Sequence, residues 1–165
     1  MASKFGELEN VIPLIAPQDI TTTATASPYV DLKTAHSMSF VLLFGNIAAA
    51  SADQAITVTV ECVTGAASAS NETAIAFSYR KSTAVGANSL GSKTAATSSG
   101  VSVATTDDNK ILLIDVDPAV VAAALADARY VRVVITPDAG ASATLVAALA
   151  VIKPRYVQNA MVSAT

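Results

Sequence analysis

The alternation of apolar and polar residues constrains the fold of this 165-residue chain more than any other feature. From Ile56 to Cys62 every second residue is apolar, and the residues between are threonine or glutamate. Thr73–Lys81 and Tyr130–Thr136 repeat this spacing. Successive side chains of a β-strand point to opposite faces of its sheet. The pattern therefore predicts several strands, each with one face buried and one face in water.

Two further runs, Met38–Phe44 and Ala143–Ile152, are apolar on both faces. Strands of this kind lie in the middle of a packed sandwich or against another subunit, and the two cases look alike in sequence. For the second run, both alternatives stay open. If the strand lies at a subunit interface, one of its two faces makes that contact, and the predicted interface residues are Val146, Ala148, Ala150 and Ile152. Leu145, Ala147, Leu149 and Val151 form the opposite face.

A single short helix is predicted at about residues 118–127. Asp117 can cap its first turn, Pro118 suits the first helical position, and alanine-rich sequence follows. Lys110–Asp117 before it reads as a strand that becomes polar at its end. Strands separated by short turns, with one helix, predict a mainly β chain folded as an antiparallel β-sandwich of about eight strands. A jelly roll is the preferred topology.

The chain divides into three parts on composition. Residues 1–28 contain Pro13, Pro17 and Pro28 and predict an extended N-terminal arm with room for one edge strand. Residues 29–153 hold the predicted strands and form the sandwich domain. Residues 154–165 begin with Pro154 and predict an extended C-terminal tail. Within the domain, Thr83–Thr106 is rich in small residues and predicts an exposed excursion or a weakly packed hairpin.

Charge and hydropathy exclude several classes of protein. The net charge of −3, with basic residues scattered along the chain, argues against nucleic-acid binding, which needs a basic patch. The longest nearly apolar run, Ala143–Ile152, is shorter than the ~20 residues of a membrane-spanning helix. The first twenty residues do not have the pattern of a secretory signal, so we expect synthesis in a cytoplasm.

The residues that most often carry chemistry have plainer interpretations here. His36 has no recognisable catalytic partner in sequence and is interpreted as a polar residue at the entry to a strand. Cys62 falls on an apolar face and is interpreted as buried. Asp107-Asp108-Asn109 and Asp115-Val116-Asp117 offer oxygen ligands, but neither fits a calcium loop, so a turn and a helix cap are favoured. We therefore expect no enzyme activity, no cofactor and no metal site.

Several segments of the chain resemble small structural proteins of tailed bacteriophages. They are Ser27–Lys33, Ser39–Asn46, Ile56–Glu61, Asp108–Pro118, Tyr130–Asp138 and Lys153–Asn159, and they cover most of the chain from Pro28 to Asn159. The resemblance is strongest to proteins encoded among head-assembly genes. It implies a capsid decoration, or cement, protein on the outside of the virion, which forms a homotrimer and binds the major capsid protein.

The resemblance also implies that an extended arm reaches a neighbouring subunit. In this chain the apolar residues of such an arm, and hence the predicted capsid contacts, are Phe5, Leu8, Val11, Ile12, Leu14 and Ile15. Two alternatives remain. One is a tail or head–tail connector subunit of the same kind of virion. The other is a β-sandwich module that binds a carbohydrate or another ligand, for which the tyrosines are the only candidate stacking surfaces because tryptophan is absent.

Overall fold

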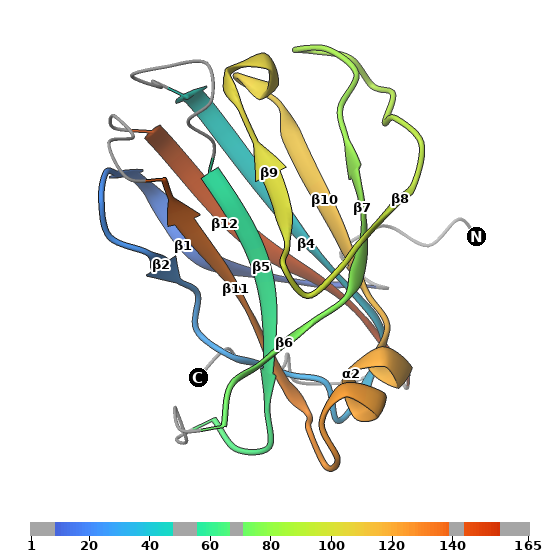
Figure 1. The fold of residues 1–165 in the computed structure, drawn as a ribbon. Coiled ribbons are helices and arrows are strands. Elements are labelled where there is room, and N and C mark those ends of the chain that lie inside the picture. Colours follow the sequence, from blue (N-terminus) through green and yellow to red (C-terminus); the bar gives the residue numbers. More distant parts are fainter. Residues whose placement is uncertain (1–8, 48–55, 67–70, 139–143, 156–165) are drawn as a thin grey trace, which may run out of the picture.

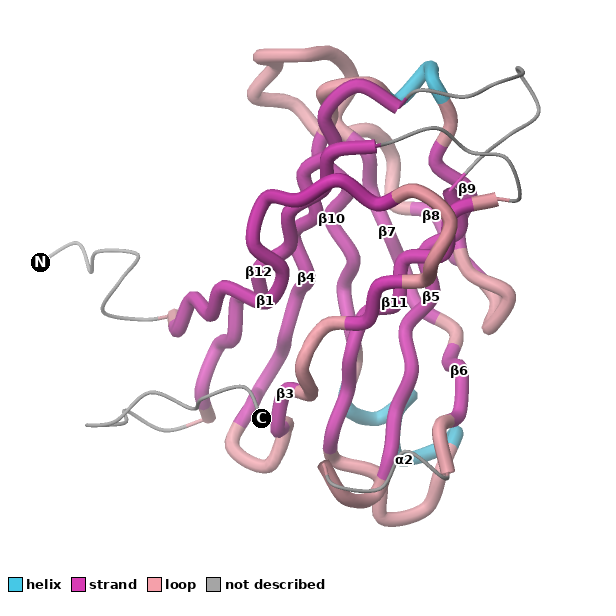
Figure 2. Tube along the Cα trace, turned by 90° about the vertical axis from the view of Figure 1, so that its left-hand side faces the viewer, coloured by secondary structure: helices cyan, strands magenta, loops and turns pink. Residues whose placement is uncertain are grey.

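The computed structural model describes residues 9–47, 56–66, 71–138 and 144–155. They fold into two antiparallel β-sheets, and Figure 2 shows the sheets as two layers, with β4 and β12 in one and β5 and β11 in the other. Sheet A has the order β1-β12-β4-β10-β7-β8, and sheet B has the order β2-β11-β5-β6, with β3 also on β11 and β9 also on β5. The β-sandwich prediction is confirmed.

The strands and helices have the following bounds in chain order (Figure 1): β1 Asn10–Ile20, β2 Thr25–Ala26, β3 Val30–Asp31, β4 Ala35–Ile47, β5 Ile56–Val63, β6 Thr73–Ile75, β7 Phe77–Lys81, β8 Thr94–Ala96, β9 Val101–Val103, the 3-10 turn η1 Thr105–Asp107, β10 Ile111–Val116, α2 Pro118–Ala124, β11 Tyr130–Pro137 and β12 Thr144–Pro154.

The pairing of early with late strands gives the topology. β1 pairs with β12, β2 and β3 pair with β11, and β4 pairs with β10. At the centre of this series, β5 pairs with β6 and β9. The chain therefore folds as one long hairpin whose two arms are wrapped together into two sheets, which is the jelly-roll arrangement.

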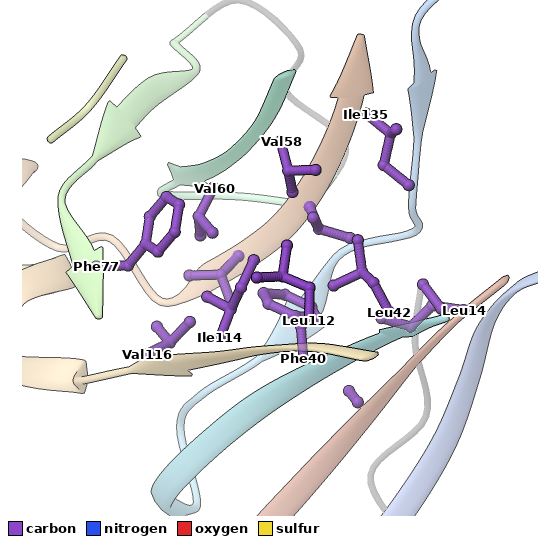
Figure 3. Packing of buried hydrophobic residues seen from close by; sticks show 14 of the residues in the cluster. Leu14, Phe40, Leu42, Val58, Val60, Phe77, Leu112, Ile114, Val116 and Ile135 are labelled. Atoms are coloured by element: carbon purple, nitrogen blue, oxygen red, sulfur yellow. The ribbon is translucent and has the colours of Figure 1, made fainter. Parts of the chain in front are cut away.

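The core lies between the two sheets and is built from the alternating residues that the sequence pattern predicts. Phe40 and Leu42 of β4, with Leu112 and Ile114 of β10, face sheet B (Figure 3). Each of these four side chains is at most 1% exposed. From sheet B, the inward side chains are mainly valine, with Val58, Val60, Val131 and Val133 fully buried. β-branched residues fit this position because they pack well on a pleated surface.

The helix begins as predicted and ends three residues earlier. The Asp117 side chain accepts a hydrogen bond of 2.8 Å from the Ala119 amide, and Pro118 occupies the first turn of α2. Leu125 ends α2 in an extended conformation. α2 packs against β4 and β6 (Figure 1). Val121 is its buried side chain.

Two segments differ from the prediction. The single strand expected at Thr73–Lys81 divides at Ala76 into β6 in sheet B and β7 in sheet A, so the chain crosses between the layers there. Thr83–Thr106 contains β8, which extends the edge of sheet A, and β9, which pairs with β5 in sheet B. Gly100 lies between them at φ 87°, and a Cβ atom there would come within 2.4 Å of the Val58 carbonyl oxygen. Only glycine avoids this contact.

Candidate interaction surface

The outward side of sheet A is apolar across its three central strands. Eight side chains from β4, β10 and β12 make up this surface, here named the apolar face: Val41, Leu43, Ile111, Leu113, Leu145, Ala147, Leu149 and Val151. Their neighbours along each strand point inward and are buried. An antiparallel sheet normally places polar residues on the side that no other layer covers. The apolar face departs from that pattern.

The register joins these side chains into one continuous patch. Leu43 of β4 pairs with Ala147 on one side and Ile111 on the other. In the next row, Val41 pairs in the same way with Leu149 and Leu113. The three most accessible members are Leu43 at 43%, Leu145 at 46% and Ile111 at 38% exposure. Contiguous exposed apolar surface of this kind usually marks a contact with another molecule.

A charged residue stands at each side of the apolar face. Asp19 on β1 is exposed and pairs with Leu145, while Arg80 on β7 pairs with Leu113. Within the described parts of the chain, neither side chain has an ion-pair partner. The Nε atom of Arg80 is buried and has no hydrogen-bond partner. A buried donor left unpaired costs free energy.

The outward side of sheet B is charged and internally paired. Arg132 of β11 forms ion pairs with Glu61 at 2.8 Å and Glu72 at 2.5 Å, and its guanidinium lies 4.9 Å from the centre of the Tyr29 ring. Tyr29 donates a 2.6 Å hydrogen bond to Glu72. At the same end of β11, Arg129 pairs with Asp31. These contacts satisfy the charges of sheet B within the chain.

Within this network, the pKa of the Tyr29 phenol is strongly shifted. Burial, followed by the hydrogen bond to Glu72, raises the pKa of Tyr29 to about 12, although the positive charge of Arg132 acts in the opposite direction. The phenol is therefore neutral at physiological pH and acts as a hydrogen-bond donor. Arg132 holds the two carboxylates together around it.

A separate groove of about 600 Å³ lies where β4, β7, β8 and β10 meet the start of α2. Its polar lining includes His36, Lys93, Asp115 and Asp117, together with three serines. Lys93 lies 3.6 Å from Asp115, which also accepts a hydrogen bond of 3.0 Å from Ser39. The lining of the groove thus offers hydroxyl, carboxylate, amine and imidazole groups, a mixture suited to a small polar ligand.

The acidic turn residues have structural roles. Asp107 pairs with Lys81 at 2.6 Å, and Asp108 accepts a 2.8 Å hydrogen bond from the Ile47 amide. Among the described residues, no three histidine, cysteine, aspartate or glutamate side chains are grouped so as to hold a metal ion. Cys62 is fully buried on the inward side of β5, and burial raises the pKa of its thiol.

The predicted subunit-interface residues lie inside the chain. Val146, Ala148, Ala150 and Ile152 are at most 3% exposed and face sheet B. The sequence left two alternatives for this strand, burial within one sandwich or contact with another subunit. These four residues are buried within the sandwich of the single chain. The opposite set, from Leu145 to Val151, lies on the apolar face. The sequence shows that both faces of the strand are apolar but not which of them the second sheet covers.

The structure places most of the predicted capsid contacts in β1. Ile12, Leu14 and Ile15 are 5–8% exposed and form part of the core, while Val11 is half-buried beside Val151. Phe5 and Leu8 lie outside the described residues. A capsid contact through Ile12, Leu14 or Ile15 would require β1 to leave sheet A. The sandwich as folded thus includes Asn10–Ile20, ahead of the predicted boundary at residue 28.

The chain has low similarity to known proteins. No known protein family matches the chain, and no curated protein does. Two solved structures are similar over 88% of the chain. One is a structure of infectious bursal disease virus Gt strain, with 12% sequence identity and a TM-score of 0.26. The other is of infectious bursal disease virus Gx strain, with 11% sequence identity and a TM-score of 0.24. The chain spans about two fifths of the length of these structures, 41% and 40% respectively.

The described α-helix is seven residues long. No helix in the described part of the chain is therefore long and apolar enough to cross a membrane.

Proposed function

We propose that this chain is a non-enzymatic structural protein of a tailed-bacteriophage virion, which decorates the outside of the head and stabilises it by binding the major capsid protein. The observation that carries the proposal is the apolar face of sheet A. A chain that exposes a continuous apolar surface on one sheet, and satisfies its charges internally on the other, is suited to work by association. The resemblance of Ser39–Asn46 and Tyr130–Asp138 to phage head proteins supplies the setting.

The direct test is binding to heads of the phage whose genome encodes the chain. Purified protein is mixed with expanded capsids that lack it, and the pellet is analysed after sedimentation. The proposal expects saturable binding and a higher temperature of capsid disruption. Immunogold label on the tail of intact particles would instead support the connector alternative. An absence of both binding and label would contradict a virion role.

The N-terminal contribution can be tested in the same assay without disturbing β1. A variant that lacks residues 1–8 removes the predicted contacts Phe5 and Leu8 and keeps Asn10–Ile20 in sheet A. If residues 1–8 hold the capsid, this variant folds with an unchanged melting temperature and loses binding. Full binding by the variant would assign the capsid contact to another part of the chain.

The groove beside α2 favours a second candidate function, a module that binds a small polar ligand such as a sugar. Its hydroxyl, carboxylate and amine groups match the hydroxyls of a saccharide. A ligand that binds only the folded chain raises its melting temperature. Melting with a panel of mono- and oligosaccharides, for the wild type and for Lys93→Ala, tests this function. No shift with any member would reject it for sugars.

A further inference from the structure

We infer that the apolar face of sheet A packs against the same face of a second copy of this chain, about a two-fold axis that passes through Leu43. The inference rests on the association part of the proposed function and not on its virion setting. This two-fold contact takes the place of the homotrimer that the resemblance implies. Because a second copy then covers the apolar face, the capsid contact of the proposed function falls to residues 1–8, which the truncation above tests.

The size of the apolar face fits a weak, reversible dimer. Strands lie ~4.8 Å apart and outward residues of one strand ~6.8 Å apart, so the area from β1 to β7 and from Leu145 to Val151 is about 400 Å². Two such faces together bury roughly 800 Å², below the range of permanent complexes and near that of transient ones. We therefore expect association that depends on protein concentration.

The positions of the flanking charges point to a second copy as the partner. On one side of Leu43, the neighbouring strand is β12, where Ala147 is its pairing partner. Leu145 is the next outward residue along β12, and Asp19 of β1 pairs with it. Asp19 thus lies two strands from Leu43 and one outward step toward the Leu145 end of the face.

The other side has the matching arrangement with opposite charge. Ile111 of β10 is the pairing partner of Leu43, and Leu113 is the next outward residue along β10. Arg80 of β7 pairs with Leu113. Arg80 therefore lies two strands from Leu43 and one outward step in the direction opposite to that of Asp19.

Consider a two-fold axis that runs parallel to the sheet, over Leu43 and perpendicular to the line from Asp19 to Arg80. Rotation about this axis places the Asp19 position of one copy opposite the Arg80 position of the other. Two copies related by this axis bring Arg80 of each against Asp19 of the other, so the contact forms twice, as a self-complementary interface requires. Leu43 meets its own copy at the centre, where the side chains that contribute most to binding usually lie. The Arg80 guanidinium, which has no ion-pair partner in the described chain, thereby gains one.

Charge-reversal variants test the pairing. Arg80→Asp and Asp19→Arg each place like charges opposite one another in the dimer, and the double variant restores opposite charges with the order reversed. Neither residue has an ion-pair partner within the described part of the chain, so the fold is expected to tolerate all three variants. Leu43→Asp removes the centre of the contact. Thr136→Asp, on an exposed position of β11 in sheet B, is the matched control.

The measurement is sedimentation equilibrium at protein concentrations from about 10 μM to 1 mM, a range that covers weak complexes. The expected result is a mass that rises from one chain toward two for the wild type and for Thr136→Asp. Each single reversal weakens association at least about tenfold, the double variant recovers it to within about threefold, and Leu43→Asp remains a monomer.

Three results would overturn the inference: a wild-type mass of one chain at every concentration, a limiting mass of three chains, or single reversals that the double variant does not rescue. The capsid-binding assay is independent of this measurement. A chain that dimerises but does not bind capsids would contradict the virion role and leave the inference standing. A chain that binds capsids and never dimerises would support the virion role and contradict the dimer.

Discussion

The outward faces of the two sheets differ, although their inward faces are built alike. On sheet B, Arg132, Glu61 and Glu72 form a closed network, and the remaining outward positions of β5 are Thr57, Thr59 and the buried Val63. On sheet A, the central outward positions are leucine, isoleucine, valine and alanine. The charges on the flanking strands, Asp19 and Arg80, have no ion-pair partners in the described chain, while Asp115, the next outward residue after Leu113 on β10, pairs with Lys93. Sheet B is thus complete in water, whereas sheet A gains free energy when a second surface covers it.

The difference shows how two sheets of one sandwich can have separate tasks. Both contribute to the core through alternate residues of their strands, and that contribution requires only one face of each strand. The other face is free to vary. In sheet B it carries charges that are paired within the chain, and in sheet A it provides the proposed docking surface.

The largest difference in the free energy of unfolding is expected between substitutions on the inner and the outer face of one strand. Leu42 and Leu43 are neighbours on β4 and are 0% and 43% exposed, respectively. Leu42→Ala creates a cavity in the core and is expected to lower the free energy of unfolding by about 3 kcal/mol. Leu43→Ala is expected to cost less than about 1 kcal/mol in the monomer. Urea unfolding at low protein concentration measures both, and equal losses would contradict the assignment of inner and outer faces.

A smaller difference in the free energy of unfolding is expected between substitutions of the arginines on the two sheets. Arg132→Met leaves Glu61 and Glu72 facing each other without their shared cation, and a loss of about 2 kcal/mol is expected. Arg80→Met removes no ion pair and places an apolar chain beside Leu113, so the monomer should be nearly unaffected. Chemical unfolding again provides the measurement. A loss for Arg80→Met as large as that for Arg132→Met would show that Arg80 has a role within the single chain.

A third difference is the pH dependence that Tyr29 gives to sheet B. Its pKa of about 12 in the folded chain lies above the value near 10 of an unfolded tyrosine. The stabilisation by the neutral phenol is therefore complete below pH 10 and is lost as the pH rises from about 10 to 12. Tyr29→Phe should reduce this decline relative to the wild type, measured by urea unfolding at a series of pH values. Identical pH profiles for the two proteins would contradict the raised pKa.

Much of the fold could be predicted because it depends on local pattern. The alternation from Ile56 to Cys62 and in Tyr130–Thr136 gives β5 and most of β11. Asp117 followed by Pro118 fixes the start of α2 through one hydrogen bond. The break at Ala76 was missed because the alternation continues unchanged through it while the chain passes from one sheet to the other.

The interaction surface was harder to predict because it depends on the covering layer. In Ala143–Ile152 both sets of alternate residues are apolar, so the sequence contains the members of β12 on the apolar face but not the side on which sheet B lies. Likewise, nothing near Asp19 or Arg80 in sequence shows that they flank one patch. That relation arises from the registers of β1 with β12 and of β7 with β10. Long-range pairing of this kind has no local signal.

We propose that a second molecule covers the outward face of sheet A and not that of sheet B. The most direct measurement is hydroxyl-radical footprinting of the wild-type chain at low and high protein concentration. We expect protection of Leu43, Ile111 and Leu145 to rise with concentration, while Val134 and Thr136 on sheet B keep constant reactivity. If the reactivity of Leu43, Ile111 and Leu145 does not change with concentration, or if protection is confined to sheet B, the proposed contact through sheet A is contradicted.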